Sequence, residues 1–189
     1  MTGRTHQFIG FTTVYTFALL ASYDSFNLQT VVFGVVLISL GALMPDLDSE
    51  DNVIYSLVPV GRRVISEIFE RVFGRHRSIS HSLLGIFLFG LLSHWLIFRI
   101  PGANGLNLSA LWYAYFISLV MHVVADMLTK DGVPLLWPLR VRFGFPPFKF
   151  LRIKTGGWFE MYVVNGFLIV WIFVLSFLYF DRLFSIFQF

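Results

Sequence analysis

Five hydrophobic segments constrain the fold of this chain more than any other feature. They run from Phe8 to Ser22, Leu28 to Met44, Ser82 to Ile100, Leu108 to Leu128 and Tyr162 to Phe180. A helix that crosses a bilayer needs about 20 mostly apolar residues, and all but the first segment come close to that length. Only 13% of the residues are charged, about half the share in a soluble domain. We therefore predict an all-α integral membrane protein with about five transmembrane helices in a single membrane-embedded domain, residues 1–189.

The two long connectors, residues 45–81 and 129–161, differ in character. Within the first, Val53 to Phe73 has apolar residues at helical spacing with charged residues between them, which predicts an amphipathic helix lying at the membrane interface. The second is rich in proline, glycine and aromatic residues from Pro134 to Gly157, which predicts a surface loop or a short hairpin.

The distribution of positive charge predicts the orientation. With five spans, the N-terminus and both long connectors lie on one side of the membrane, and 12 of the 14 Lys and Arg residues fall on that side. Only Arg99 and Arg182 fall on the other. The positive-inside rule makes the first side cytoplasmic. We expect a multi-pass protein of the cytoplasmic (inner) membrane with a cytoplasmic N-terminus. A net charge of +3 gives no case for nucleic-acid binding.

Histidine and aspartate residues gather at the predicted cytoplasmic ends of the first four segments. They are His6, Asp46, Asp48, His76, His81, His122 and Asp126. His122 and Asp126 are four residues apart in a predicted helix, so they share one face. Ionisable groups at membrane depth are costly and are by default functional. Because the chain has no cysteine, a metal site must use imidazole and carboxylate ligands, and these seven residues are the predicted ligands. Glu160, at the mouth of the fifth segment, is a further candidate carboxylate.

Each of these residues has an ordinary explanation when taken alone. A single histidine at a membrane boundary is usually an interfacial polar residue, which is how we interpret His94. An aspartate after Pro45 is common in turns. His122 and Asp126 alone could form an interhelical hydrogen bond. The four helix ends taken together favour a metal site.

Several stretches resemble the family of LexA-regulated, inner-membrane, metal-dependent hydrolases. They are Gly41–Asp48, His76–Ser82, His122–Thr129, Gly132–Pro138 and the early Thr5-His6 pair. The resemblance covers about Thr5 to Glu160, and it departs from the family pattern at Ser80, where threonine is expected before the second histidine. The family implies a multi-span protein with a hydrolytic metal centre. It does not supply a substrate.

The predicted ligands and their depth suggest a function. A divalent metal, zinc first and manganese or iron second, would activate water for hydrolysis. Asp48 and His81 are the candidates for acid–base chemistry, and Arg77 is the candidate for holding a phosphate. A site at headgroup level favours a membrane lipid as substrate, with a lipid-linked phosphoester first and a carboxylic ester or amide second. Protein partners stay open.

Two other functions compete with hydrolysis. A divalent metal transporter or sensor is one, but the apolar interiors of the second and fifth segments argue against a transport path. A purely structural metal site is the other, and a closed site without an exchangeable water would favour it.

The predicted orientation can be tested with reporter fusions. A reporter at Gly105 should give an external signal and one at Lys149 an internal signal, because the positive charges hold the second long connector inside the cell. An external signal at Lys149 would contradict the topology and, with it, the placement of the four helix ends on the cytoplasmic side.

Overall fold

The computed structural model describes the whole chain except residues 22–26, 48, 50–61, 74–78, 140 and 187–189. The described part is all-helical, which confirms the predicted class, and its two isolated β-bridges form no strand. The α-helices are α1 (Gly3–Leu20), α2 (Leu28–Leu43), α4 (Arg62–Phe73), α5 (Leu83–Ile97), α6 (Leu108–Met127), α7 (Asn165–Leu178) and α8 (Phe180–Ile186).

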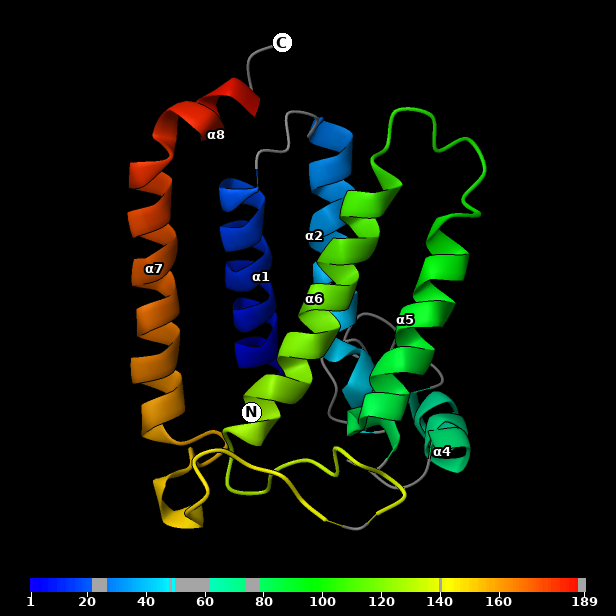
Figure 1. Cartoon of the computed structure of the whole chain (residues 1–189), viewed down its shortest axis with the longest axis vertical. Helices are drawn as coiled ribbons and strands as arrows, with labels where there is room; N and C mark the ends of the chain where they lie inside the picture. The colour runs from blue at the N-terminus through cyan, green and yellow to red at the C-terminus, as the bar shows by residue number, and fades with distance from the viewer. Residues whose placement is uncertain (22–26, 48, 50–61, 74–78, 140, 187–189) are drawn as a thin grey trace.

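The five predicted spans correspond to α1, α2, α5, α6 and α7, which run side by side (Figure 1). Three helical stretches are long and apolar enough to cross a membrane: Leu28–Asp46, Leu108–Met127 and Phe159–Leu178. Helix α5 is apolar but shorter, and α1 is not among the three. The start of α1 and helix α8 lie at opposite ends of the bundle (Figure 1).

The start of the first helix was predicted wrongly. Helix α1 begins at Gly3 rather than at Phe8, because the side chain of Thr2 accepts a hydrogen bond from the backbone N–H of Thr5 and caps the helix. His6 therefore lies inside the first helix rather than before it.

The predicted amphipathic helix is described only from Arg62 onward, as α4; the part before it lies outside the described residues. Val64 and Ile68 are exposed on one face of α4, and the ring of Phe69 stacks on Phe89 of α5 with centroids 5.9 Å apart. The exposed apolar face fits the expected position at the membrane interface.

Small residues allow α1, α2 and α6 to pack closely. Ser118 of α6 donates a hydrogen bond to the carbonyl of Ile38 in α2 at 2.8 Å. A Cβ atom added at Gly41 would lie 2.3 Å from the carbonyl oxygen of Tyr115, and one added at Gly10 would lie 2.2 Å from Ser118 Oγ. Such contacts between small residues are the common basis of helix packing in membranes. They fix the ends of α2 and α6, from which three of the predicted ligands project.

Helix α7 is more peripheral. It packs mainly against α1, and most of its large apolar side chains are exposed, as expected of a surface that faces lipid. Two polar contacts tie it to α1: the Tyr15 and Ser176 hydroxyls lie 2.6 Å apart, and the Trp171 indole donates to Thr16 Oγ1 at 3.1 Å. A π-helical turn, Phe159–Val164, precedes α7.

The close approach of α2 and α6 predicts that Gly41→Ala lowers stability. The added methyl group would meet the Tyr115 backbone, so the helices must separate, at a cost of about 1–3 kcal/mol. Gly34→Ala in the same helix is the control, because among the described residues its Cβ would meet Leu111 alone, at 3.9 Å. Thermal unfolding in detergent, followed by circular dichroism, measures both. Equal melting temperatures for the two variants would contradict this packing.

Candidate metal centre

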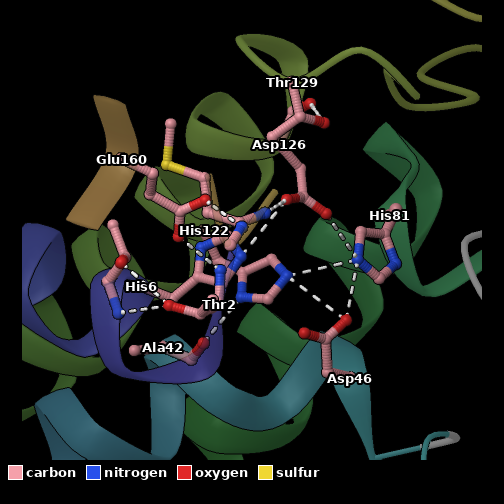
Figure 2. Close-up of polar contacts among 12 residues, drawn as sticks. Thr2, His6, Ala42, Asp46, His81, His122, Asp126, Thr129 and Glu160 are labelled. Atoms are coloured by element: carbon pink, nitrogen blue, oxygen red, sulfur yellow. Dashed lines mark hydrogen bonds and ion pairs between the residues drawn. The ribbon is translucent and has the colours of Figure 1, made fainter. Parts of the chain in front are cut away.

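Five of the seven predicted ligands meet at one end of the helical bundle (Figure 2). His6 comes from the first turns of α1, Asp46 from the 3-10 turn Met44–Asp46 after α2, and His81 from the 3-10 turn Ile79–His81 before α5. His122 and Asp126 come from the last turns of α6. The turn after α2 contains Pro45, which cannot donate the backbone hydrogen bond of a continuing helix. The α-helix therefore ends at Leu43, and Asp46 lies in the 3-10 turn that follows it.

Four of these residues form a compact group of donor atoms. Asp46, His81, His122 and Asp126 each offer one ligand atom, and the four atoms all lie within 4.8 Å of one another. Their side chains are buried, except that 18% of the Asp46 side chain is exposed. Such a group can hold a metal ion.

The spacing of the donor atoms fits four-fold coordination. His81 Nε2 lies 3.2 Å from His122 Nε2, 3.2 Å from Asp46 Oδ1 and 3.5 Å from Asp126 Oδ2, and His122 Nε2 lies 3.6 Å from Asp46 Oδ1. In a tetrahedral site with metal–ligand distances of about 2.0–2.2 Å, neighbouring ligand atoms lie about 3.3–3.6 Å apart. These four distances are close to that spacing, and all donor atoms lie within 4.8 Å of one another.

His122 is oriented by the end of α2. Its Nδ1 donates to the carbonyl oxygen of Ala42 at 2.6 Å, so the proton sits on Nδ1 and the lone pair of Nε2 faces the other donor atoms. This tautomer is the one a metal needs, and a backbone carbonyl is a common partner for the second nitrogen of a ligating histidine. The same contact satisfies a carbonyl in the last turn of α2.

His81 is oriented by the residue before it. Ser80 Oγ lies 3.0 Å from His81 Nδ1 in a buried pair, which leaves Nε2 facing Asp46, His122 and Asp126. Serine keeps the hydroxyl that threonine would supply at this position.

The two carboxylates require positive charge beside them. Burial by itself lowers the pKa of the His81 imidazole, but the carboxylates of Asp126 and Asp46 raise that pKa to about 9. The two carboxylates therefore favour the protonated form of His81, and the amino group of Met1 also contacts Asp126 Oδ1. A metal ion among the four donor atoms would take the place of the proton on His81 Nε2.

His6 lies next to the group of four. Its Nε2 is 3.2 Å from Asp126 Oδ1, the oxygen other than the one nearest His81. Its ring stacks on that of His122 with centroids 3.7 Å apart. The contact with Asp126 lies at ion-pair distance but lacks hydrogen-bond geometry, since neither ring nitrogen makes a hydrogen bond in the described part of the chain. His6 is thus placed to orient the Asp126 carboxylate, or to bind an ion after a small shift.

Asp48, His76 and Arg77 lie outside the described residues. Their roles as ligands or catalytic groups stay predictions. The same holds for the coordination of a second metal ion, for which these residues would be needed.

Glu160 is close to the site but is already fully engaged. It is buried, and its two carboxylate oxygens accept the backbone N–H groups of Thr2 at 2.7 Å and Gly156 at 2.9 Å. It therefore joins the start of the fifth span to the start of α1, which carries His6. The sequence marked Glu160 only as a further carboxylate, because nothing local indicates which backbone groups it will meet. Thr129 was missed too: its hydroxyl donates to the Asp126 carbonyl at 2.8 Å.

Comparison with known proteins places the chain among inner membrane proteins. It matches the family described as YdjM inner membrane protein over residues 1–188. It is 35% identical over 134 residues to the inner membrane protein YdjM of Escherichia coli, a match that covers 70% of this chain and 61% of that protein. It is 29% identical over 166 residues to the uncharacterized protein YvsG of Bacillus subtilis, covering 88% and 89%. No solved structure matches. The names of the family and of its E. coli member indicate the inner membrane, and they name no reaction.

We predict that the centre binds a divalent metal ion and that this binding requires its histidines. Elemental analysis of purified protein should find near-stoichiometric metal, and the double variant His81→Ala with His122→Ala should lose it, because two of four donor atoms are gone. His94→Ala is the control: His94 is outside the donor group, stacked on Phe98 with centroids 4.4 Å apart. Unchanged metal content in the double variant would rule out this centre.

Glu160→Gln should destabilise the protein without removing a ligand. The amide nitrogen would face one of the two backbone N–H groups that now donate to a carboxylate oxygen. Both bonds are partly buried, so the loss should be about 1 kcal/mol, the lower end of the cost of a donor left without an acceptor. Thermal unfolding measures the loss, with Asp181→Asn, an exposed carboxylate in α8, as the control. A melting temperature equal to that of the control would show that Glu160 does not hold α1 in place.

Proposed function

The chain belongs to the YdjM inner membrane protein family, and we propose that it is a membrane-bound, metal-dependent hydrolase. One observation supports this proposal above all: two imidazole and two carboxylate groups from three helix ends bring their ligand atoms within 4.8 Å of one another. A donor set of two imidazoles and two carboxylates without thiolate suits zinc first, with manganese or iron as the alternatives.

Partial exposure on one side of the site is compatible with catalysis. Asp46 is the one residue of the four with a partly exposed side chain, at 18%, so we propose that water and substrate approach the donor group from the Asp46 side. A bound divalent ion supplies Lewis acidity there, lowering the pKa of a coordinated water towards about 7 and polarising the bond to be hydrolysed.

The residues around the donor group have separate tasks. Asp46, His81, His122 and Asp126 would hold the ion, the Ala42 carbonyl and Ser80 fix the two imidazoles, and His6 orients Asp126. Asp48 follows Asp46 closely in the sequence and is our candidate for accepting a proton from water. Arg77 is our candidate for pairing with a substrate phosphate, because a guanidinium binds phosphate oxygens through two parallel hydrogen bonds.

The depth of the site suggests the substrate. The donor group lies at the ends of apolar helices, at the level that lipid headgroups occupy, so we propose a lipid-linked phosphoester reached from the cytoplasmic leaflet. The cytoplasmic side follows from the distribution of Lys and Arg. A carboxylic ester or amide of a membrane lipid is the second substrate class.

A structural metal is the second candidate function, favoured by the complete burial of His81, His122 and Asp126. An ion there would hold the ends of α2, α5 and α6 together. The two functions differ in the need for an open coordination position.

A lipid hydrolysis assay distinguishes them. Metal-loaded protein in detergent micelles should release phosphate or headgroup from a panel of phospholipids and polyprenyl phosphates. Asp46→Asn should lower the rate at least about 100-fold, since it weakens a metal ligand on the partly exposed side, while His94→Ala keeps full activity. Hydrolysis of esters or amides alone would favour the second substrate class. Full metal occupancy with no hydrolysis of any substrate would favour the structural role, and metal uptake into proteoliposomes would favour a transporter.

A further inference from the structure

We propose that the segment joining α6 to α7, residues 128–158, is a binding surface for anionic phospholipid headgroups. We call it the α6–α7 loop. It runs along the end of the bundle that carries the donor group (Figure 1). The inference is independent of the proposed hydrolysis, because it rests on side chains that point away from the protein. These exposed apolar residues are Leu136, Trp137, Leu139, Val141, Phe145, Phe148, Phe150, Leu151 and Trp158.

Backbone hydrogen bonds hold the loop in a defined shape. Val133 and Phe143 exchange two bonds of 2.8 Å. The loop is also fastened to the helices: Phe145 N–H donates to the Met127 carbonyl of α6 at 2.9 Å, and Leu83 N–H of α5 donates to the Leu135 carbonyl at 3.0 Å. The exposure of the aromatic side chains is therefore a property of the folded loop.

Arg152 shapes the part of the loop that carries most of the phenylalanines. Its guanidinium donates to the carbonyl oxygens of Pro146 and Pro147 at 2.7 and 3.0 Å. It fills the space beside Gly144, where an added Cβ would lie 2.2 Å from Arg152 Nη1. Arg152 packs against the backbone of the loop, whereas Phe148 and Phe150 are exposed, with their ring centroids 5.9 Å apart.

The position of this apolar surface indicates a membrane. The loop joins two helical stretches long and apolar enough to span it. Trp158, with 69% of its surface exposed, directly precedes the second of them. Large exposed apolar patches mark sites of membrane or protein contact, and aromatic side chains next to the ends of membrane spans favour the headgroup level.

The positive charges of the loop favour contact with anionic rather than neutral lipid headgroups. Among its described residues the exposed cations are Lys130, Arg142, Lys149 and Lys154, and Asp131 is the one acidic residue in its sequence. Lys149 lies between Phe148 and Phe150 in the sequence, so a cation and two rings share one short stretch. Rings inserted among headgroups together with cations at their level match a leaflet rich in anionic phospholipid.

The absence of cysteine from the sequence allows a direct test by spin labelling. A nitroxide is attached to Phe150→Cys or Phe148→Cys in proteoliposomes of phosphatidylcholine with and without phosphatidylglycerol. The control is Asn104→Cys, an exposed site in the short connector between α5 and α6. Power saturation then compares collisions with oxygen, which enters the bilayer, and with a water-soluble nickel chelate.

We expect oxygen to dominate at residues 148 and 150, and more strongly when phosphatidylglycerol is present, while the nickel chelate dominates at residue 104. Lys149→Gln should weaken the dependence on phosphatidylglycerol about fivefold, the effect of one cation at an anionic surface. Dominance of the nickel chelate at both loop positions would overturn the proposal. So would equal oxygen exposure in both lipids, which would mean insertion without recognition of charge. Protection from both reagents would mean that a protein surface covers the loop, and would overturn it too.

Discussion

The burial of two aspartates among three histidines at the end of an apolar helical bundle is the constraint on which the rest of the structure depends. Asp126 is fully buried, and Asp46 is partly buried, with 18% of its side chain exposed. A buried carboxylate without a partner is strongly unfavourable, so each must meet a proton donor or a cation. His6 lies at ion-pair distance from Asp126, and His81 lies at ion-pair distance from both carboxylates. These contacts between histidine and aspartate side chains form only when the ends of α1, α2, α5 and α6 lie together.

The packing of the bundle delivers the side chains to that point. Gly10, Gly41 and Ser118 allow α1, α2 and α6 to approach closely, and this fixes the distance between the last turns of α2 and α6. The end of α2 then supplies both a ligand, Asp46, and the carbonyl of Ala42 that orients His122. Glu160 ties the fifth span to the start of α1 from the other side. The donor group is thus a product of helix packing rather than of any single motif.

Much of this arrangement could be predicted from the sequence. Apolar segments of spanning length gave the helices, because hydropathy and length are sufficient signals in a membrane. The spacing of His122 and Asp126 placed both on one helical face, and the alternation of spans brought His81 and Asp46 to the same end.

What could not be predicted depended on contacts between distant residues. The early start of α1 follows from the Thr2 cap and from the Glu160 carboxylate 158 positions away, whereas the apolar pattern of the first segment begins only at Phe8. A backbone acceptor such as the Ala42 carbonyl has no signature in the sequence at all. The contact between Ser80 and His81 has none either, because a hydroxyl can pair with many groups, and only the fold decides which.

X-ray absorption spectroscopy of the zinc-loaded protein tests the central claim most directly. We expect the zinc ion to be coordinated by about four nitrogen and oxygen atoms at about 2.0–2.1 Å. The spectrum should also show the outer-shell scattering of two imidazole rings, those of His81 and His122. A shell of oxygen atoms alone, without imidazole scattering, would contradict the claim, because the metal would then be bound elsewhere than among the buried histidines.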